Sequence, residues 1–385
     1  MSLKNIKTIG ERRKFLEKET GVTLEHISVF PDNLKIASEK NCENMIGAVQ
    51  IPLGVAGPIK IRGNYARGEF YLPLATHEAA LVASVNRGCK AVTLSGGVNV
   101  VVENAGITRG PVFQTKSLKD SHEFKDWLEK NFPRLAEIAQ STSSHLSLLK
   151  QKISIIGKNV FVRFSFDTSD AMGMNMATYA TDKIASYIRQ EIKVECLSLA
   201  GNFDLDKKPS YLNFSEGRGK KVWAEAVLSP QTVREVLKTT PEKIHKLAVT
   251  KCYLGSIMSG SLGFNAHFTN MIAAIFLATG QDAAHVVEGS LGITATDMSG
   301  GSLYISIYLP DLPVGTIGGG TGLPAQSEAL RLLGVYGGRD GKNSMKLAEI
   351  IGAGVLAGEL SLLASLAQGS LAQAHRKLSG HIKYE

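Results

Sequence analysis

Residues 201–209 place a carboxylate and two ammonium groups side by side: the stretch reads Gly-Asn-Phe-Asp-Leu-Asp-Lys-Lys-Pro, with Asp206, Lys207 and Lys208 adjacent. Its first two residues are turn formers, and its final proline disfavours helical backbone at the residue before it. Because the extended run 194–199 precedes it, we expect a loop that leaves a sheet. Loops on a rigid scaffold often carry binding and catalytic groups. Taken alone, the stretch is also typical of a solvated surface turn.

Three further residues carry groups suited to acid–base or charge chemistry. Thr76 is placed to cap a helix beginning there, which would put Glu78 in its first turn, where the helix dipole favours a negative charge. Asp282 lies in an apolar neighbourhood, where a carboxylate is either paired or functional. His375 lies near the chain end, where a lone histidine is most often a surface residue. Each of the three therefore also has an ordinary structural interpretation.

Glycine is the outlier of the composition. The chain has 39 glycines in 385 residues, against the ~27 expected from average usage. The densest cluster, 315–322, would let a phosphate or a ring approach bare backbone, although a flexible loop has the same composition. No Gly-x-Gly-x-x-Gly follows a predicted strand, so the sequence does not predict a Rossmann cofactor site.

The remaining composition excludes several classes of protein. The net charge of +8 comes from basic residues spread along the chain without interleaved aromatic residues, which argues against a nucleic-acid partner and fits small polyanionic ligands. The four cysteines stand far apart, so neither a disulfide framework nor a zinc site is predicted. The N-terminus lacks a secretory signal and no apolar run is long enough to span a membrane. We therefore predict a cytoplasmic protein.

The expected elements predict an α+β protein. Residues 1–42 would form a helical cap that begins with a capping box, and residues 51–58 are too rich in Pro and Gly for regular structure. Residues 110–198 alternate strands and helices, which is typical of a mostly antiparallel α+β unit. Beyond it we expect a helix over 263–279 and a buried central helix over 346–368.

Several stretches, in one order and spacing, together resemble the 3-hydroxy-3-methylglutaryl-coenzyme A (HMG-CoA) reductase family. The matching residues are 43–47, 75–88, 108–112, 170–176, 201–202 with 206–209, 280–284 and 315–321. They span nearly the whole chain from residue 43, so the resemblance is highly specific and outweighs the ordinary interpretations given above. It is to the class I type, in a soluble form without a membrane domain.

The resemblance implies an NAD(P)H-dependent oxidoreductase that converts HMG-CoA to mevalonate and coenzyme A, the committed step of the mevalonate (isoprenoid) pathway. Lys207 matches the cation that stabilises the oxyanion, and Glu78 matches the acid that protonates the aldehyde oxygen. Asp282 matches the carboxylate that holds these two together, and His375 the acid that protonates the coenzyme A thiolate. The implied coenzyme is NADPH, with NADH possible, and no metal is required.

The resemblance also assigns ligand-binding residues. Arg109, Asp206, Lys208, Lys251 and Asn270 match positions that hold the hydroxymethylglutaryl group, and Ser84, Asn86 and Arg87 match the region that contacts coenzyme A. Asp170, Ala171, Met172, Gly173, Met174, Asn175, Ser141, Ser143, Gly318, Gly319 and Gly320 match the nicotinamide site.

The implied architecture is a ferredoxin-like small domain, 110–198, inserted into a large helix-rich domain made of 43–109 and 199–385. The small domain would bind the nicotinamide coenzyme and the large one coenzyme A. In the family the site forms between two subunits, so a homodimer or higher oligomer is expected. The expected partners are small molecules (HMG-CoA, mevalonate and coenzyme A), with no nucleic acid and no membrane.

The sequence departs from the family pattern in several places. His77 and Ala79 flank the acid where the family has Thr and Gly, and Ala200 replaces a serine of the substrate loop. Relatives that prefer NADPH have arginines where this chain has Ser144 and, near the C-terminus, Gly380, so we predict weakened discrimination against NADH. The alternative function is a basic binding protein, or a family member that binds coenzyme A thioesters without reducing them.

Overall fold

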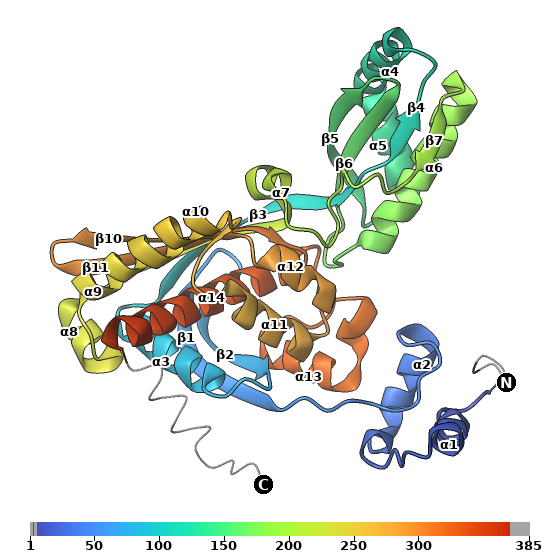
Figure 1. Cartoon of the computed structure of the whole chain (residues 1–385). Coiled ribbons are helices and arrows are strands. Elements are labelled where there is room, and N and C mark those ends of the chain that lie inside the picture. Colours follow the sequence, from blue (N-terminus) through green and yellow to red (C-terminus); the bar gives the residue numbers. More distant parts are fainter. Residues whose placement is uncertain (1–2, 4–5, 370–385) are drawn as a thin grey trace.

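The computed structural model describes Leu3 and residues 6–369 of the chain. It consists of a large body, a smaller unit that projects from the body, and an N-terminal cap connected by an extended segment (Figure 1). The predicted residue His375 lies outside the described residues.

The cap is helical, as the sequence predicts, and its first helix has the predicted ends. Its elements are α1 (Ile9–Thr20), η2 (His26–Ser28), η3 (Asp32–Ile36) and α2 (Ala37–Lys40). The predicted capping box is confirmed: Thr8 Oγ1 accepts the Glu11 N–H at 3.2 Å, and Glu11 Oε2 accepts the Thr8 N–H at 3.1 Å. Helix α1 ends at Gly21, whose φ of +71° suits glycine. The hydrogen bonds of the cap stay within residues 3–50.

A mixed sheet forms the centre of the body. Its strands are β1 (Leu53–Arg62), β2 (Arg67–Ala75), β3 (Val98–Arg109), β8 (Arg218–Leu228), β9 (Gly263–Phe264), β10 (Gly292–Ser299) and β11 (Ser302–Leu312). The spatial order is β2-β1-β3-β8-β11-β10-β9, with β1–β3 and β10–β9 parallel and the other pairs antiparallel. The expectation that 51–58 is irregular is wrong. Strand β1 covers most of that segment, because its ladder with β2 shifts register between Ala56 and Ile59 and so accommodates Gly57 and Pro58.

Helix α14 (Lys342–Gln368) lies at the centre of the body beside the sheet (Figure 1) and is buried on almost every side, which confirms the predicted central helix. It is the only described helix long and apolar enough to span a membrane, and most of that apolar stretch is buried within the protein. The other body elements are α3 (Leu81–Leu94), α7 (Tyr211–Glu216), α8 (Pro230–Thr232), η4 (Val233–Leu237), α9 (Pro241–Ala248), η5 (Val249–Gly255), α10 (Ser256–Ser259), α11 (Phe268–Thr279), η6 (Ala283–His285), α12 (Val286–Gly289), η7 (Gly319–Gly322) and α13 (Pro324–Leu332).

Two helices begin later than the sequence predicts. Helix α3 begins at Leu81 instead of Thr76, because the chain turns at Ala80 with a φ of +72°. Glu78 therefore lies in a turn ahead of the helix. Helix α11 begins at Phe268, because residues 263–264 pair with β10 as strand β9.

The small unit has its own antiparallel sheet and its own core. Its strands are β4 (Val112–Gln114), β5 (Ser147–Ile156), β6 (Asn159–Asp167) and β7 (Glu195–Ser198), and its helices are α4 (Leu118–Lys130), α5 (Phe132–Gln140) and α6 (Met174–Ile192). The order is β5-β6-β4-β7, and the core is rich in phenylalanine, including Phe113, Phe164 and Phe166. The end of β3 also pairs with β6, so one strand connects the two sheets. The α+β class is thus confirmed.

Candidate active site

Residues 201–209 form a loop between β7 and α7, as predicted, and the end of β3 anchors it. Thr108 Oγ1 donates to the carbonyl oxygen of Asp204 at 2.8 Å, and Arg109 Nη1 lies 3.2 Å from Asp204 Oδ2. Lys207 has a φ of +59°, which side chains other than glycine adopt infrequently. Backbone strain of this kind persists where the surroundings fix it, and it is common at functional sites.

Lys207 and Asp282 form an ion pair at the surface of the body. The Lys207 Nζ to Asp282 Oδ2 distance is 2.8 Å, and both side chains are partly exposed. The hydrogen bond that Lys207 donates to Asp282 raises the pKa of Lys207. Burial raises the pKa of Asp282, but the hydrogen bonds from Lys207 and from the Ala284 N–H outweigh burial, so this pKa lies below its usual value. Both groups are therefore charged across neutral pH.

A fully buried arginine lies beneath this pair. Arg218, at the start of β8, bonds Glu288 Oε1 through Nη1 at 2.7 Å and Asp206 Oδ1 through Nη2 at 2.9 Å. The same Glu288 oxygen accepts the backbone N–H of Lys207 at 2.8 Å. Arg218 thus joins Asp206 of the loop to Glu288, which also accepts a hydrogen bond from the loop backbone. Breaking such a buried pair costs much more than breaking an exposed one.

Sequence reasoning missed Arg218, Glu288 and His285, which packs beside them. A weak signal was present. Arg218 lies between two glycines at the start of a strand, and Glu288 is a carboxylate within a stretch of small and apolar residues. Charged residues in such settings are usually paired, but the sequence does not show with what.

Glu78 lies elsewhere in the same chain. Its Oε1 accepts a hydrogen bond of 3.3 Å from Asn270 Nδ2, in the first turn of α11. Asp282, the partner of Lys207, follows the other end of that helix. About 14 Å of helix axis separates Asn270 from Thr279 at 1.5 Å per residue. The structure therefore brings together Lys207 with Asp282, and Glu78 with Asn270, at opposite ends of α11.

Three predicted substrate-binding cations differ in how they are held. Arg109 is mostly buried, and its Nε is a buried donor without a partner among the described residues. Lys208 Nζ donates to the carbonyl oxygen of Asp206 at 3.2 Å, and Lys251 is exposed on η5. The Nε of Arg109 is thus a donor that has no partner among the described residues and is shielded from solvent.

The residues predicted to contact coenzyme A are engaged within the body. Ser84 Oγ lies 2.9 Å from Ser361 Oγ, and Arg87 Nη2 donates to the Ser361 carbonyl oxygen at 2.7 Å. Asn86 Oδ1 accepts the Gly57 N–H at 2.9 Å. These bonds tie α3 to α14 and β1, and burial lowers the pKa of Arg87. A role in binding coenzyme A stays a prediction.

Asp170 of the predicted cofactor site is buried and bound to backbone. Its Oδ2 accepts the N–H of Arg339 and, at 2.9 Å, that of Gly341, and its Oδ1 accepts the N–H of Ser344 at 2.9 Å. The carboxylate therefore fastens the segment 170–175 to the start of α14.

Two of the predicted cofactor segments lie together. A parallel bridge between Ala171 and Ile317 places 170–175 beside 315–320. Gly318 and Gly319 have positive φ values of 79° and 54°, and a Cβ on either would meet open space. Bare backbone is therefore accessible at this turn.

The other predicted cofactor residues, Ser141 and Ser143, follow α5 in the small unit. Ser141 Oγ donates to the Ile138 carbonyl oxygen at 2.7 Å, and Ser143 Oγ accepts the His145 N–H at 3.1 Å. These bonds are local, and a cofactor role of the two serines stays a prediction.

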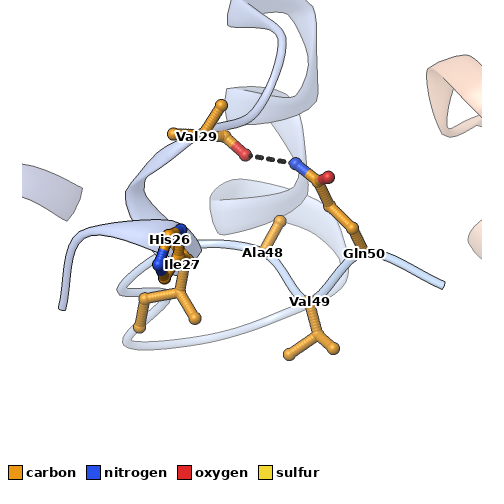
Figure 2. Close-up of a pocket in the computed structure, with 6 residues that line it drawn as sticks. All are labelled: His26, Ile27, Val29, Ala48, Val49 and Gln50. Atoms are coloured by element: carbon orange, nitrogen blue, oxygen red, sulfur yellow. Dashed lines mark hydrogen bonds between the residues drawn. The ribbon is translucent and has the colours of Figure 1, made fainter. Parts of the chain in front are cut away.

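A cavity of about 400 Å³ lies between the cap and the segment 48–50 that follows it (Figure 2). Its lining consists of His26, Ile27, Val29, Ala48, Val49 and Gln50. Gln50 Nε2 donates to the Val29 carbonyl oxygen at 2.9 Å across it (Figure 2). None of its lining residues belongs to the predicted site, so the candidate chemistry lies elsewhere.

Residues 8–380 match the family model of hydroxymethylglutaryl-coenzyme A reductase. The 3-hydroxy-3-methylglutaryl-coenzyme A reductase of Methanocaldococcus jannaschii is 52% identical over 373 residues, covering 95% of this chain and 91% of that protein. Reductase 2 of Dictyostelium discoideum is 47% identical over 345 residues, covering 87% and 65%. The class II reductase of Streptococcus pneumoniae, solved bound to NADPH in open conformations, has a similar fold, with a TM-score of 0.69 at 19% identity over 94% and 97%.

Proposed function

This chain belongs to the hydroxymethylglutaryl-coenzyme A reductase family, and from that membership we infer that it reduces HMG-CoA to mevalonate and coenzyme A with two equivalents of reduced nicotinamide. The observation that carries the chemistry is the Lys207–Asp282 pair, an ammonium group held at 2.8 Å by a carboxylate on a strained loop. The loop also supplies the neighbouring Asp206 and Lys208.

We propose that Lys207 stabilises the charge that each reduction creates. Reduced nicotinamide, when bound, supplies the hydride for both steps. After each hydride transfer the substrate oxygen carries negative charge, which a positioned ammonium group stabilises. Asp282 holds Lys207 Nζ in place and keeps it protonated, since its hydrogen bond raises the pKa of the lysine. The first hydride adds to the thioester carbon. The carbon–sulfur bond then breaks, which releases the coenzyme A thiolate and leaves an aldehyde, and the second hydride reduces that aldehyde.

Two protons complete this account. We propose that Glu78, oriented by Asn270, protonates the oxygen formed from the aldehyde. His375 would protonate the thiolate and so prevent its return to the aldehyde. Arg109 and Lys208 would hold the substrate carboxylate.

We further propose that the site forms between two subunits. Within one chain, α11 separates Glu78 from Lys207 by more than the reach of a shared hydrogen bond. A partner related by two-fold symmetry would place its own Glu78 beside Lys207, since an isologous interface repeats each contact twice. An oligomer of dimers would satisfy the same condition.

The segments 170–175 and 318–320 support the predicted nicotinamide site. The open space around Gly318 and Gly319 would let a phosphate or a ring approach the backbone of this turn. Asp170 would fix the position of this segment, because its carboxylate accepts hydrogen bonds from backbone N–H groups at the start of α14. NADPH is the favoured coenzyme, with weakened discrimination against NADH. The class I type, a ferredoxin-like small domain (110–198), the cap boundary at residue 42 and a cytoplasmic location complete the proposal.

The decisive experiment follows the absorbance of reduced nicotinamide with HMG-CoA as substrate. We expect two equivalents of coenzyme to be oxidised per free thiol released, and neither acetyl-CoA nor coenzyme A alone to support oxidation. Lys207→Ala should remove the activity, whereas Lys243→Ala, an exposed lysine on α9, should retain it. Binding of HMG-CoA without oxidation of the coenzyme would support the alternative, a binding protein that has lost catalysis.

A further inference from the structure

His285 is a buried histidine beside the catalytic pair for which the chemistry above has no use. Its side chain is fully buried between η6 and α12. Its Nδ1 bonds Glu288 Oε2, and its Nε2 is a buried atom without a hydrogen-bond partner among the described residues. An unpartnered buried nitrogen is uncommon, because leaving a polar group unsatisfied destabilises the fold.

The unpartnered nitrogen faces the catalytic carboxylates. Nε2 lies 3.7 Å from Asp282 Oδ2 and 3.7 Å from Asp206 Oδ1. The Asp282 oxygen is the same atom that bonds Lys207 Nζ. A movement of under ~1 Å would turn either distance into an ordinary hydrogen bond. Neighbouring groups therefore run from Glu288 through His285 and Asp282 to Lys207, and the 3.7 Å between His285 and Asp282 is the one step without a hydrogen bond.

The charges around the ring favour a proton on Nε2. A lone pair there would face two carboxylate oxygens, whereas an N–H would be attracted to both. Two cations already balance part of the negative charge, and an imidazolium would balance more of it. The titratable and charged groups around the ring, from every element packed against it, are Asp206 and Lys207 on the loop, Arg218 on β8, Asp282 before η6, Glu288 on α12 and, beyond Arg218, Asp311 on β11.

The alternative interpretation of this cluster is a metal site, because Asp206, His285 and Glu288 place possible ligand atoms close together. Arg218 opposes it. Its guanidinium already takes Asp206 Oδ1 and Glu288 Oε1 at 2.9 and 2.7 Å, and a cation placed among these atoms would meet the positive charge of the arginine.

We propose that His285 is a positioning residue that acts through Asp282 and restores the proton that the Glu78–Lys207 network gives to the product oxygen. The Nε2–H bond of the imidazolium breaks as an O–H bond forms on Asp282 Oδ2. Once Lys207 has given a proton to the Glu78 carboxylate that protonated the product oxygen, the proton on Asp282 passes to the neutral Lys207 Nζ. The imidazole, left neutral with its proton on Nδ1, is reprotonated at Nε2 from water through Asp282 after the product leaves. Glu288 fixes Nδ1 and so aims Nε2 at Asp282.

The test rests on the proposed function and compares pH–rate profiles of the wild type and His285→Gln. Glutamine keeps a hydrogen-bonding group of similar reach but does not relay a proton. Both profiles are measured with mevaldehyde, which releases no thiolate, so that His375 takes no part. In the wild type, kcat should fall as pH rises. In His285→Gln this alkaline limb should move, because Glu78 is no longer recharged through His285, and kcat should fall roughly 10²-fold, the lower end for a positioned proton donor, with KM unchanged. A purely structural histidine would instead leave the limb in place.

The control is His245→Gln, since His245 is half-buried on α9 and bonds Thr296 away from the site. It should behave as the wild type. A wild type that oxidises no coenzyme would contradict the proposed function itself. An active wild type whose alkaline limb persists unchanged in His285→Gln would overturn only the role of His285.

A second measurement does not depend on turnover. The ring signals of His285 in a nuclear magnetic resonance titration of the free protein can be assigned by their absence in His285→Gln. Asp282→Asn removes the negative charge 3.7 Å from Nε2, so the midpoint of this titration should move to lower pH. A midpoint that stays in place would show that the two side chains are not coupled and would contradict the proposal.

Discussion

The backbone N–H of Lys207 donates a hydrogen bond of 2.8 Å to Oε1 of Glu288, a carboxylate that solvent does not reach. The same oxygen bonds Arg218 at 2.7 Å. The position of the reactive lysine is therefore set by a buried ion pair that lies outside the loop. Disturbing the pair should affect both the stability of the protein and the placement of the loop.

Glu288→Ala should lower the free energy of unfolding by about 3–5 kcal/mol, because Arg218 would be left buried and partly unpaired. Urea denaturation followed by circular dichroism measures the change. The control is Glu328→Ala, at an exposed position on α13, which should change stability by less than about 0.5 kcal/mol. Equal losses in the two variants would contradict the anchoring role of Glu288.

Ala200→Ser should lower the KM for HMG-CoA by roughly tenfold with little change in kcat. A hydroxyl at this exposed position would add a hydrogen bond to the substrate carboxylate, worth about 1.5–3 kcal/mol with a charged partner. The bond would be alike in ground and transition states. Steady-state kinetics tests this, with Ala325→Ser on α13 as the control. An unchanged KM, or a change confined to kcat, would mean that this loop position is wrongly assigned.

Lys207→Ala and His375→Gln should differ on the free aldehyde. Lys207 stabilises charge on oxygen in both reductions, so its loss should abolish reduction of HMG-CoA and of mevaldehyde. His375 would serve only the departing thiolate, and mevaldehyde releases none, so His375→Gln should spare that reaction. The measurement is the rate of each variant with HMG-CoA and with mevaldehyde. Equal losses of both activities in His375→Gln would count against the role of His375 as the thiolate acid.

Ser144→Arg should shift coenzyme preference toward NADPH. Ser144 is exposed just beyond α5, and an arginine there could bind a 2′-phosphate through paired charged hydrogen bonds. The ratio of kcat/KM for NADPH to that for NADH should rise relative to the wild type. Ser154→Arg, a substitution within β5, should leave the ratio unchanged. A wild type that already prefers NADPH strongly would contradict the predicted weak discrimination.

Local patterns predicted some elements well because their causes are local. The Thr8–Glu11 capping box and the loop at 201–209 depend on neighbouring residues. Strand β1 was missed because its proline lies at an irregularity that only the pairing with β2 reveals. Glu78 was misplaced because the turn at Ala80 adopts a positive φ without a glycine.

The residues of the candidate site were likewise predicted only in part from the sequence. Lys207, Glu78 and Asp282 were found through the family resemblance, and their residue types suit the chemistry. Arg218 and His285 were not found, because their roles depend on contacts between β8, α12 and the loop. No spacing along the chain encodes such contacts.

The most direct test of the shared site mixes two inactive variants, Lys207→Ala and Glu78→Ala, and allows their subunits to exchange. Each mixed dimer would hold one site with an intact Lys207 and an intact partner Glu78. Random exchange in equal amounts should therefore restore about a quarter of wild-type activity in a two-fold symmetric dimer. Activity that stays at the level of the separate variants, although mass spectrometry shows mixed dimers, would contradict a site built from Lys207 of one subunit and Glu78 of the other.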